Sequence, residues 1–411
     1  MKTINKQKTL YLSVITLFLV GLLENISKNA INVAMIPLTK AFDLNPSQIG
    51  LVLSCFFATY SIMTFLGGVL SDKLGAKKVL AISVIAAGAC SGLIGMVTSF
   101  AMLIALRCIL GITQGVFPAA SSVAVAELFS RKKRGTGKSI ITSSAPLGSA
   151  FGAIAIGALT NAFGWRVAFA VLGVVLALVG AIFFLIYKPT QPKVEKSKNS
   201  TNKMSMLSVF KIPLVWKLVI CNFGFGVFLW GMVPWLPTYF SKVKHLDMVS
   251  VATLSSIPPL ASFVFMIFGG VIIDKYLVGR EKLFISVCCV VGSVFVGLTY
   301  TASTVILAFT YYAVANVVLG VAVPLVYILV LKYLKNDIIG QASGIVAFSQ
   351  QFAGVVAPMI MGSLVTYLNG SYGGVFVFVI VVVVIVAIVG TTINIKKDIP
   401  DEFVAEIKEN S

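Results

Sequence analysis

The sequence predicts an all-α polytopic membrane protein with 12 transmembrane helices in two six-helix bundles. Its 411 residues are 58% hydrophobic with a mean hydropathy of +1.00, and only 11% are charged, against roughly 25% in soluble domains. A bilayer-spanning helix needs about 20 apolar residues, and such stretches follow one another along nearly the whole chain. One long polar segment, rich in Lys, Ser and Asn, divides the chain near its middle. These observations exclude a soluble protein.

The first half contains six apolar segments separated by Gly, Pro and charged turns. Lys2, Lys6 and Lys8 precede the first segment as in a secretory signal, but no small-residue cleavage site follows it, so we expect an uncleaved span. Charged turns at 73–78 and 131–134 mark the ends of the second and fourth segments. The expected spans are 9–36, 47–70, 78–99, 101–129, 137–161 and 165–187.

The second half repeats this layout after the polar segment, which reads as a flexible linker. Its expected spans are 216–241, 249–273, 282–301, 304–333, 340–369 and 372–395. The predicted domains are an N-terminal six-helix bundle at 1–187, a cytoplasmic linker at 188–215, a C-terminal six-helix bundle at 216–395, and a solvated cytoplasmic tail at 396–411.

The net charge of +18 would suggest nucleic-acid binding in a soluble protein, but here it follows membrane topology. When the spans alternate from a cytoplasmic N-terminus, nearly all Lys and Arg residues fall in inner segments. Only Lys40, Arg166, Lys242 and Lys244 fall in outer ones. This positive-inside bias places both termini in the cytoplasm. We therefore expect the lipid bilayer, and no nucleic acid, as a partner.

An internal repeat supports the division into halves. Gly68, Asp72 and Lys73 follow the second span, and the same spacing returns as Gly270, Asp274 and Lys275 after the eighth. The first copy continues through Gly75, Lys77 and Lys78. This loop and the six-plus-six layout resemble the major facilitator superfamily over essentially the whole chain. The resemblance implies a central cavity, alternating access by rocking of the bundles, and a gating role for the loop residues Gly68, Asp72, Lys73, Gly75, Lys77, Lys78, Asp274 and Lys275.

Three charged residues lie deep inside predicted spans, namely Glu24, Lys28 and Arg107, whereas Glu127 and Lys332 lie near cytoplasmic helix ends. An ion at a helix centre costs roughly 2.5 to 3.5 kcal/mol on insertion scales, so each is a functional candidate. Counted at ~1.5 Å per residue from the outer helix ends, Lys28 and Arg107 lie at similar depth near the middle of the membrane. Gln114 lies two turns beyond Arg107 on the same face.

The charge balance of these residues indicates the substrate class. Glu24 and Lys28 are spaced to pair as i and i+4, but that pair would leave Arg107 without a counter-charge. Because Arg grips a carboxylate bidentately and Lys acts as a point charge, two basic groups at one depth favour an organic anion. Asn25, Ser27, Asn29 and Asn32 extend the polar face of the first span, which we expect to line a wet cavity.

Local motifs resemble the anion:cation symporter branch of the superfamily, which carries sugar acids and other carboxylates. The runs from Lys28 to Ala34 and from Arg107 to Ala119 look like signatures of that branch, as does the turn at 164–166. Tyr60 stands at a position that resembles a substrate-contacting tyrosine. Gln351 stands where the branch commonly has asparagine.

Two departures from the branch concern proton coupling. Ser27 and Gln114 occupy positions where the branch pattern has acids. Glu24 is then the only carboxyl at the centre of the predicted membrane region. One hypothesis is that the proton occupancy of Glu24 is coupled to substrate binding. The alternative is that Glu24 forms a static ion pair with Lys28.

The second half carries neutral polar groups in place of charges. The neighbouring amides of Gln350 and Gln351 are costly to bury together, so we expect at least one to contact substrate, where it would bind hydroxyl groups of a polyol acid.

The sequence thus predicts a monomeric secondary active transporter in a bacterial plasma membrane. It is expected to take up organic anions, such as sugar acids or other carboxylates, coupled to protons or to another ion. An anion exchanger, a transporter-like anion sensor and, less well supported, a multidrug exporter remain as alternatives. No metal cluster, catalytic triad or phosphate-binding GxxxxGK motif is present, so we predict no enzyme activity and no cofactor or metal.

Overall fold

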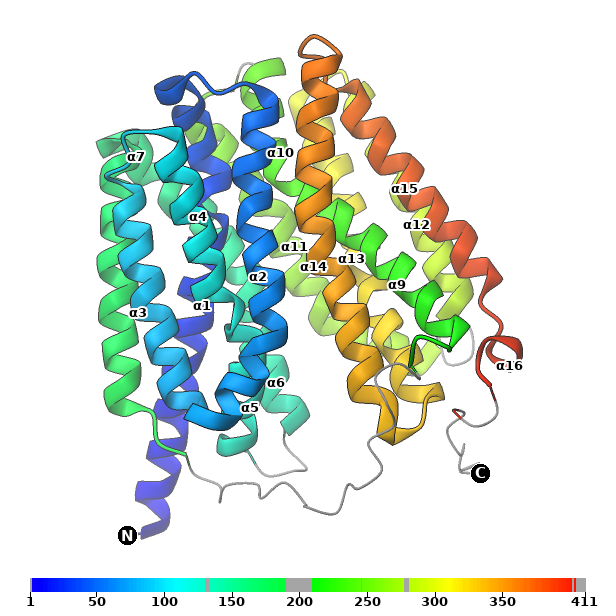
Figure 1. The fold of residues 1–411 in the computed structure, drawn as a ribbon. Coiled ribbons are helices and arrows are strands. Elements are labelled where there is room, and N and C mark those ends of the chain that lie inside the picture. The colour runs from blue at the N-terminus through cyan, green and yellow to red at the C-terminus, as the bar shows by residue number, and fades with distance from the viewer. Residues whose placement is uncertain are drawn as a thin grey trace. The chain divides into compact units, whose positions relative to one another are not determined.

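The computed structural model describes residues 2–129, 134–189, 209–244, 246–276, 281–400 and 403, and its elements are helices (Figure 1). In the first half these are α1 (Lys2–Phe42), α2 (Pro46–Leu74), α3 (Ala76–Ile94), α4 (Phe100–Gly115), α5 (Phe117–Leu128), α6 (Arg134–Thr142) and α7 (Ser144–Ile186). In the second half they are α9 (Pro213–Gly226), a π-helical turn (Val227–Met232), α10 (Val233–Val243), α11 (Met248–Tyr276), α12 (Glu281–Thr301), α13 (Val305–Tyr333), α14 (Asn336–Tyr367), α15 (Gly373–Thr392) and α16 (Ile395–Asp398).

The lengths of these helices confirm a polytopic membrane protein. Ten stretches of the described residues are long and apolar enough to cross a bilayer. One of them, Gly137–Ile186, has 50 residues and is divided at Gly164, whose φ of 81° is readily adopted only by glycine. It therefore contains two of the predicted spans. α11 accounts for another, with a described apolar part at Met248–Phe263.

The chain forms two compact units. Among the described residues, unit 1 holds α1 to α7, α10 and α11 as far as Leu260, and unit 2 holds α9, the π-helical turn, the rest of α11, and α12 to α16. The start of α11 joins unit 1 because a Cβ on Gly157 of α7 would touch the side chain of Ala252. The segment Pro234–Leu260 thus groups with the first half, and the predicted domain boundaries at 187 and 216 stay a prediction.

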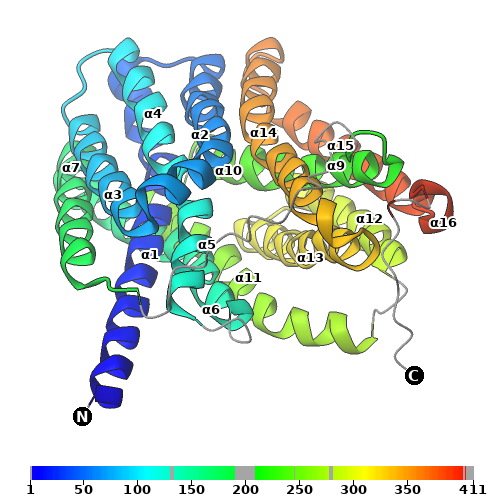
Figure 2. The ribbon, with the colours of Figure 1, turned by 60° about the horizontal axis from the view of Figure 1, so that its bottom comes forward.

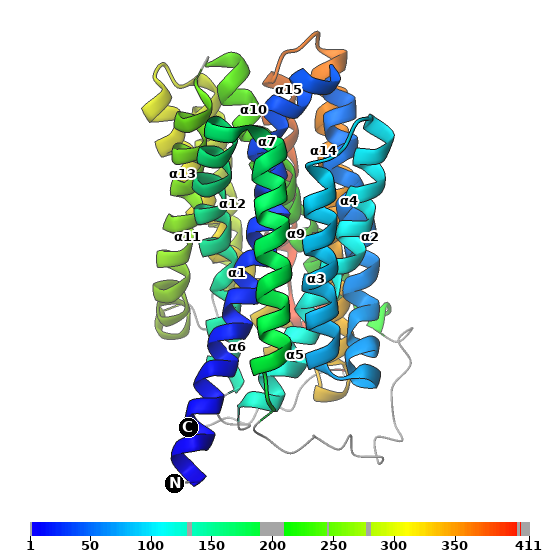
Figure 3. The same cartoon turned by 90° about the vertical axis from the view of Figure 1, so that its left-hand side faces the viewer.

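Close helix contacts through glycine organise unit 1. α7 packs against both α1 and α3, and α2 packs against α4 (Figures 1 and 3). Where α3 crosses α7, a Cβ on Gly88 would lie 2.7 Å from the carbonyl oxygen of Gly173, and one on Gly173 would lie 2.6 Å from that of Gly88. Small residues let helices in a membrane approach this closely.

Helix ends in unit 1 follow local sequence signals. α2 begins with a capping box in which the Gln48 backbone N–H donates to the Asn45 side chain and the Asn45 N–H donates to the Gln48 side chain, each at 2.9 Å. Ser99 caps α4 by accepting from the Met102 N–H at 3.2 Å. Gly75, with a φ of 85°, makes the turn between α2 and α3. These signals set where the membrane helices start and stop.

In unit 2, α12 packs on α13 and α15, and α9 packs on α14 and α15 (Figure 2). α9 continues into the π-helical turn, which is a rare form that widens the helix locally.

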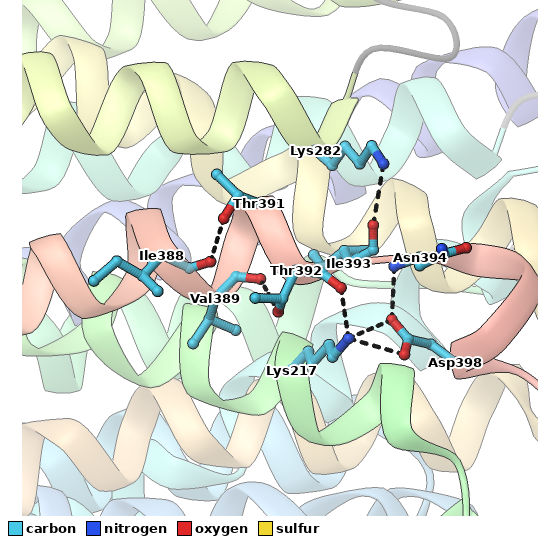
Figure 4. Close-up of polar contacts among 9 residues, drawn as sticks. All are labelled: Lys217, Lys282, Ile388, Val389, Thr391, Thr392, Ile393, Asn394 and Asp398. Atoms are coloured by element: carbon cyan, nitrogen blue, oxygen red, sulfur yellow. Dashed lines mark hydrogen bonds and ion pairs between the residues drawn. The ribbon is translucent and has the colours of Figure 1, made fainter.

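The end of unit 2 is joined by polar contacts (Figure 4). Lys217 of α9 forms an ion pair with Asp398 at 2.7 Å and donates to the Thr392 carbonyl at 2.7 Å. Lys282 of α12 donates to the Ile393 carbonyl at 3.2 Å. Farther along, Phe403 accepts from the backbone N–H of Lys335, which precedes α14, at 3.1 Å.

This arrangement differs from the solvated tail expected at 396–411. Asp398, Ile399 and Phe403 are buried. The apolar side chains of this segment pack on unit 2, and Asp398 forms its ion pair with Lys217. The other residues of that predicted tail, apart from those at 396–400, lie outside the described residues.

Candidate functional site

Two basic side chains meet around one aromatic ring inside unit 1. The Lys28 ammonium of α1 lies 6.0 Å from the centre of the Phe56 ring of α2, and the Arg107 guanidinium of α4 lies 4.5 Å from it. Lys28 lies closer still to the rings of Phe57 and Tyr60, at 4.9 and 4.4 Å. Aromatic faces attract cations, so this cluster from α2 holds both positive charges in a buried place.

Arg107 keeps part of its hydrogen-bonding capacity unused. Its side chain is 2% exposed, and its Nε donates to the backbone carbonyl of Val52 at 3.2 Å. Its buried Nη1 has no hydrogen-bond partner among the described residues. Because guanidinium carries five N–H donors and accepts none, an acceptor from outside the protein would satisfy this group.

Glycines of α4 bring Arg107 against α2. A Cβ on Gly111 would collide with the Phe56 carbonyl and the Thr59 hydroxyl, and a Cβ on Gly115 would lie 2.6 Å from the Tyr60 carbonyl. Any side chain at these positions would separate the two helices. The place of Arg107 beside Phe56 therefore depends on Gly111 and Gly115.

Glu24 lies where α1, α3 and α4 meet, and it is 4% exposed. Its Oε1 is 3.3 Å from the hydroxyl of Ser83 on α3, and that hydroxyl donates to the backbone carbonyl of Thr113 on α4 at 2.6 Å. Gln114 Nε2 donates to the Glu24 backbone carbonyl at 3.4 Å, while its buried Oε1 has no partner among the described residues. Lys28 is within electrostatic reach of the Glu24 carboxyl.

The polar face of α1 differs in part from the expected cavity lining. The hydroxyls of Ser27 and Ser91 on α3 are 2.9 Å apart, and Asn29 Nδ2 donates to Ser149 Oγ on α7 at 3.0 Å. These side chains join α1 to its neighbours, because a hydroxyl or amide in a helix bundle is satisfied as well by another helix as by water.

The predicted residues of the second half lie in unit 2. Gln350 and Gln351 are half-buried on α14, and the buried Oε1 of Gln351 has no partner among the described residues. On α9, Asn222 donates to the carbonyl of Val346 at 2.7 Å and to the hydroxyl of Tyr327 at 3.2 Å. These groups are polar and neutral, as predicted for this half.

The predicted gating loop is described in part. Lys73 and Lys78 are exposed, and the Lys77 ammonium lies 5.0 Å from the centre of the Phe184 ring of α7. Gly75 makes the turn described above. The remaining members lie on described helix backbone, but their burial and side-chain contacts are outside the described part of the structure: Gly68, Asp72, Asp274 and Lys275.

The sequence reasoning missed the neutral groups around the charges. Ser83 and Thr113 carry no charge, and a single hydroxyl in an apolar helix gives no signal in the sequence. Phe56 and Phe57 precede Tyr60 by four and three residues. That spacing places the three aromatic rings on neighbouring turns of one helix. It was the sequence signal from which the aromatic contacts of Lys28 and Arg107 could have been predicted.

Comparison with known proteins decides the family. The model of the Major Facilitator Superfamily matches residues 17–358. The chain belongs to this superfamily. Three curated relatives are a hexuronate transporter of Bacillus subtilis, a probable sulfoacetate transporter of Cupriavidus necator and a probable galactarate/D-glucarate transporter of Escherichia coli. They are 24%, 29% and 27% identical, over 88%, 98% and 90% of this chain and 89%, 98% and 91% of theirs.

Solved structures agree on the superfamily fold. A bacterial homologue of the human lysosomal transporter Spinster, in an inward-facing, unoccupied conformation, has a TM-score of 0.79 at 16% identity and covers 95% of this chain and 98% of its own. A D-xylose-proton symporter has a TM-score of 0.76 at 17% identity, with the same coverage. The protein is thus a multi-pass membrane transporter and not an enzyme, and its named relatives are those of the anion:cation symporter branch.

Proposed function

We propose that this transporter moves organic anions, in particular sugar acids or similar carboxylates, by alternating access. The observation that carries the proposal is the unused Nη1 donor of buried Arg107, held with Lys28 around Phe56. A buried guanidinium is stable only when paired. A carboxylate would neutralise the guanidinium charge and accept two parallel hydrogen bonds from it. Relatives named for hexuronate, galactarate/glucarate and sulfoacetate transport support this substrate class.

Lys28, Arg107, Tyr60 and Gln114 are the residues that we propose for anion binding in unit 1. Arg107 would hold the carboxylate, Lys28 would add charge, and Tyr60 and the unsatisfied Oε1 of Gln114 would bind hydroxyl groups. Gln350 and Gln351 are the proposed contribution of unit 2, supported by the unsatisfied amide oxygen of Gln351.

Proton coupling is the second part of the proposal, and Glu24 is its carrier. Glu24 is buried and within electrostatic reach of Lys28, so gain or loss of its proton changes the charge next to the proposed anion site. Uptake would then follow the proton gradient. We expect Glu24→Gln to abolish gradient-driven accumulation while anion exchange continues, and intact accumulation in this variant would rule out the assignment.

The further parts of the proposal concern the setting. The excess of Lys and Arg in predicted inner segments supports a bacterial plasma-membrane location with both termini in the cytoplasm. The loop residues around Gly75 and their second-half counterparts are proposed to gate the conformational change, and the monomer is the proposed working unit. Labelling of single introduced cysteines at both termini with a membrane-impermeant reagent tests the orientation.

The deciding experiment is uptake of labelled sugar acids into proteoliposomes, with and without an inward proton gradient. Hexuronates, galactarate, glucarate and sulfoacetate form the panel, and Arg107→Ala is the test variant. Arg166→Ala is the matched control, because Arg166 is already engaged, donating to the Val97 carbonyl at 3.2 Å beside the Trp165 ring. We expect accumulation in wild type and the control and none in Arg107→Ala.

Other outcomes would redirect the proposal. Counterflow without gradient-driven accumulation would identify an anion exchanger. Arg107-dependent thermal stabilisation by a carboxylate without any flux would identify a sensor. Binding of lipophilic cations alone would contradict the anion assignment and favour multidrug export.

A further inference from the structure

Ser83 contacts two neighbouring helices through one hydroxyl group, whose single hydrogen cannot serve both contacts at once. It lies on α3 and is 4% exposed. Its hydroxyl oxygen is 2.6 Å from the Thr113 carbonyl oxygen of α4 and 3.3 Å from the Glu24 carboxyl oxygen of α1. A serine hydroxyl has one hydrogen to donate and two lone pairs to accept with. One of the two contacts must therefore be made without the hydrogen of Ser83.

The two distances decide where that hydrogen lies. O–H···O hydrogen bonds have donor–acceptor distances of about 2.5 to 3.0 Å, so the 2.6 Å contact to Thr113 is a full hydrogen bond. The Thr113 carbonyl can only accept, so the Ser83 hydrogen lies on that side. The 3.3 Å contact then brings a lone pair of Ser83 toward Glu24. This second contact is favourable only when the hydrogen between the two oxygens comes from Glu24.

The Thr113 carbonyl has a structural need for this hydrogen. Thr113 is among the last four residues of α4, whose carbonyls lack the usual partner four residues ahead. α4 ends at Gly115 and α5 starts at Phe117, so Thr113 lies where one helix ends and the next begins. Ser83 thus satisfies a carbonyl at the break between α4 and α5.

The surroundings of Glu24 contain few other groups that titrate or carry charge. On its own helix Lys28 is in electrostatic reach, on α2 Tyr60, and from α4 Arg107 acts on Lys28. α3 provides the neutral Ser83 and Ser91, and α7 provides the neutral Ser144 and Ser149 toward α1. Glu127 of α5 and Lys138 of α6 are bound elsewhere: Glu127 accepts from the Tyr187 hydroxyl at 2.8 Å, and Lys138 donates to the Ser122 hydroxyl at 2.8 Å. Lys28 is thus the counter-charge available when Glu24 ionises.

We propose that Ser83 is a positioning residue that links the protonation state of Glu24 to the break between α4 and α5. When Glu24 is protonated it donates to Ser83, and Ser83 donates to Thr113. When Glu24 loses its proton to water, Ser83 turns its own hydrogen to the carboxylate and leaves the Thr113 carbonyl without a donor. Ser83 therefore joins α3 to both α1 and α4 when Glu24 is protonated, and to α1 alone when Glu24 is ionised.

This inference deepens the proposed function, because it rests on Glu24 as the coupling carboxyl. Arg107 lies on α4, the helix whose end loses its donor. Loss of the proton would thus loosen the last turn of the helix that holds the proposed anion-binding arginine. The proton and the anion would then be coupled through backbone hydrogen bonding as well as through charge.

Infrared difference spectroscopy of the purified protein during a pH titration tests the proposal without any substrate. We expect a carboxylic-acid carbonyl band in wild type, below the titration midpoint of Glu24, that is missing in Glu24→Gln. In Ser83→Ala the Glu24 acid loses its acceptor, so its band should move to higher frequency. Ser83→Thr should restore the position of the band.

Ser91→Ala is the matched control, because Ser91 lies on the same helix and its buried hydroxyl contacts Ser27 of α1 at 2.9 Å. It should leave the Glu24 band in place. If Ser83→Ala does not fold, Ser83→Cys keeps the volume with a weaker hydrogen-bonding group and should shift the band in the same direction.

Three results would overturn the inference: no acid band assignable to Glu24 at any pH of the titration, an acid band that keeps its frequency in Ser83→Ala, or a response equal to that of Ser91→Ala. Because no anion is present in this titration, none of these results bears on anion transport. Anion transport is tested separately, by uptake of the sugar-acid panel.

Discussion

Unit 1 and unit 2 bury polar groups of different kinds. In unit 1 the described interior contains the ionisable residues Glu24, Lys28 and Arg107, and Arg107 keeps an unused donor. In unit 2 the described side chains that keep an unused buried atom are neutral, as in Asn222 and Gln351, whereas its ion pair between Lys217 and Asp398 is complete. A buried positive charge forms strong, charge-assisted hydrogen bonds with an anion, whereas a neutral amide contributes weaker hydrogen bonds. Under the proposed function, this contrast predicts that unit 1 supplies the charge that binds the anion and that unit 2 contributes neutral hydrogen-bonding groups.

Arg107→Ala should show the largest effect. It removes the buried charge that the proposed carboxylate binds, and truncating one partner of such a pair costs about 2 to 5 kcal/mol. We expect affinity for a binding sugar acid to fall about 100-fold by isothermal titration calorimetry. Arg166→Ala should bind normally, and an equal loss in both variants would show that Arg107 is not a specific ligand of the anion.

Lys28→Ala should come second, with a loss of about tenfold, because Lys28 contributes a point charge already attracted to three aromatic rings. Lys28→Arg retains the charge and should bind within about twofold of wild type. Calorimetry over a range of salt concentrations measures both. Equal loss in the two variants would show that the shape of lysine, and not its charge, is what matters.

Gln351→Ala should have a smaller and selective effect. Loss of one hydrogen bond corresponds to about 1 kcal/mol, or about fivefold in affinity, and only for anions that carry hydroxyl groups. The measurement compares a polyhydroxy acid with a simple carboxylate of similar length. Gln350→Ala is the paired variant, and a uniform loss for both ligands in both variants would break the division between the charge of unit 1 and the hydrogen-bonding groups of unit 2.

Lys217→Met should change stability and leave binding unchanged. It breaks the ion pair with Asp398, whose partners are 25% and 9% exposed, so the loss should be about 1 kcal/mol or less and the unfolding midpoint should fall by about 2 °C. Differential scanning fluorimetry measures the shift, with Lys244→Met as a control outside this contact. A change in anion affinity would show that this end of unit 2 is not only structural.

The fold was largely predictable because span length, glycine turns and charged loops each carry a strong signal. α12 at Glu281–Thr301 lies within one residue of its predicted bounds. The turn predicted at 164–166 matches the break at Gly164, where the backbone is non-helical. The π-helical turn at Val227–Met232 was not foreseen, because a change in hydrogen-bond register leaves no mark in composition.

The candidate site was predictable where ions were involved and not where neutral groups carry the geometry. Depth and helical face predicted that Lys28 and Arg107 would lie near each other, and the structure places both at the Phe56 ring. The contact of Ser27 with Ser91 and the bridge at Ser83 depend on which helices become neighbours. Neither can be derived from the spacing of residues within one helix.

The backbone contact at Gly111 and Gly115 also limits how this protein can evolve. Since α2 and α4 touch through carbonyl groups at these glycines, no single substitution there can widen the spacing gradually; the first larger side chain already displaces a helix. A change of cargo is therefore reached more easily by exchanging the side chains around this crossing than by altering the two glycines that form it.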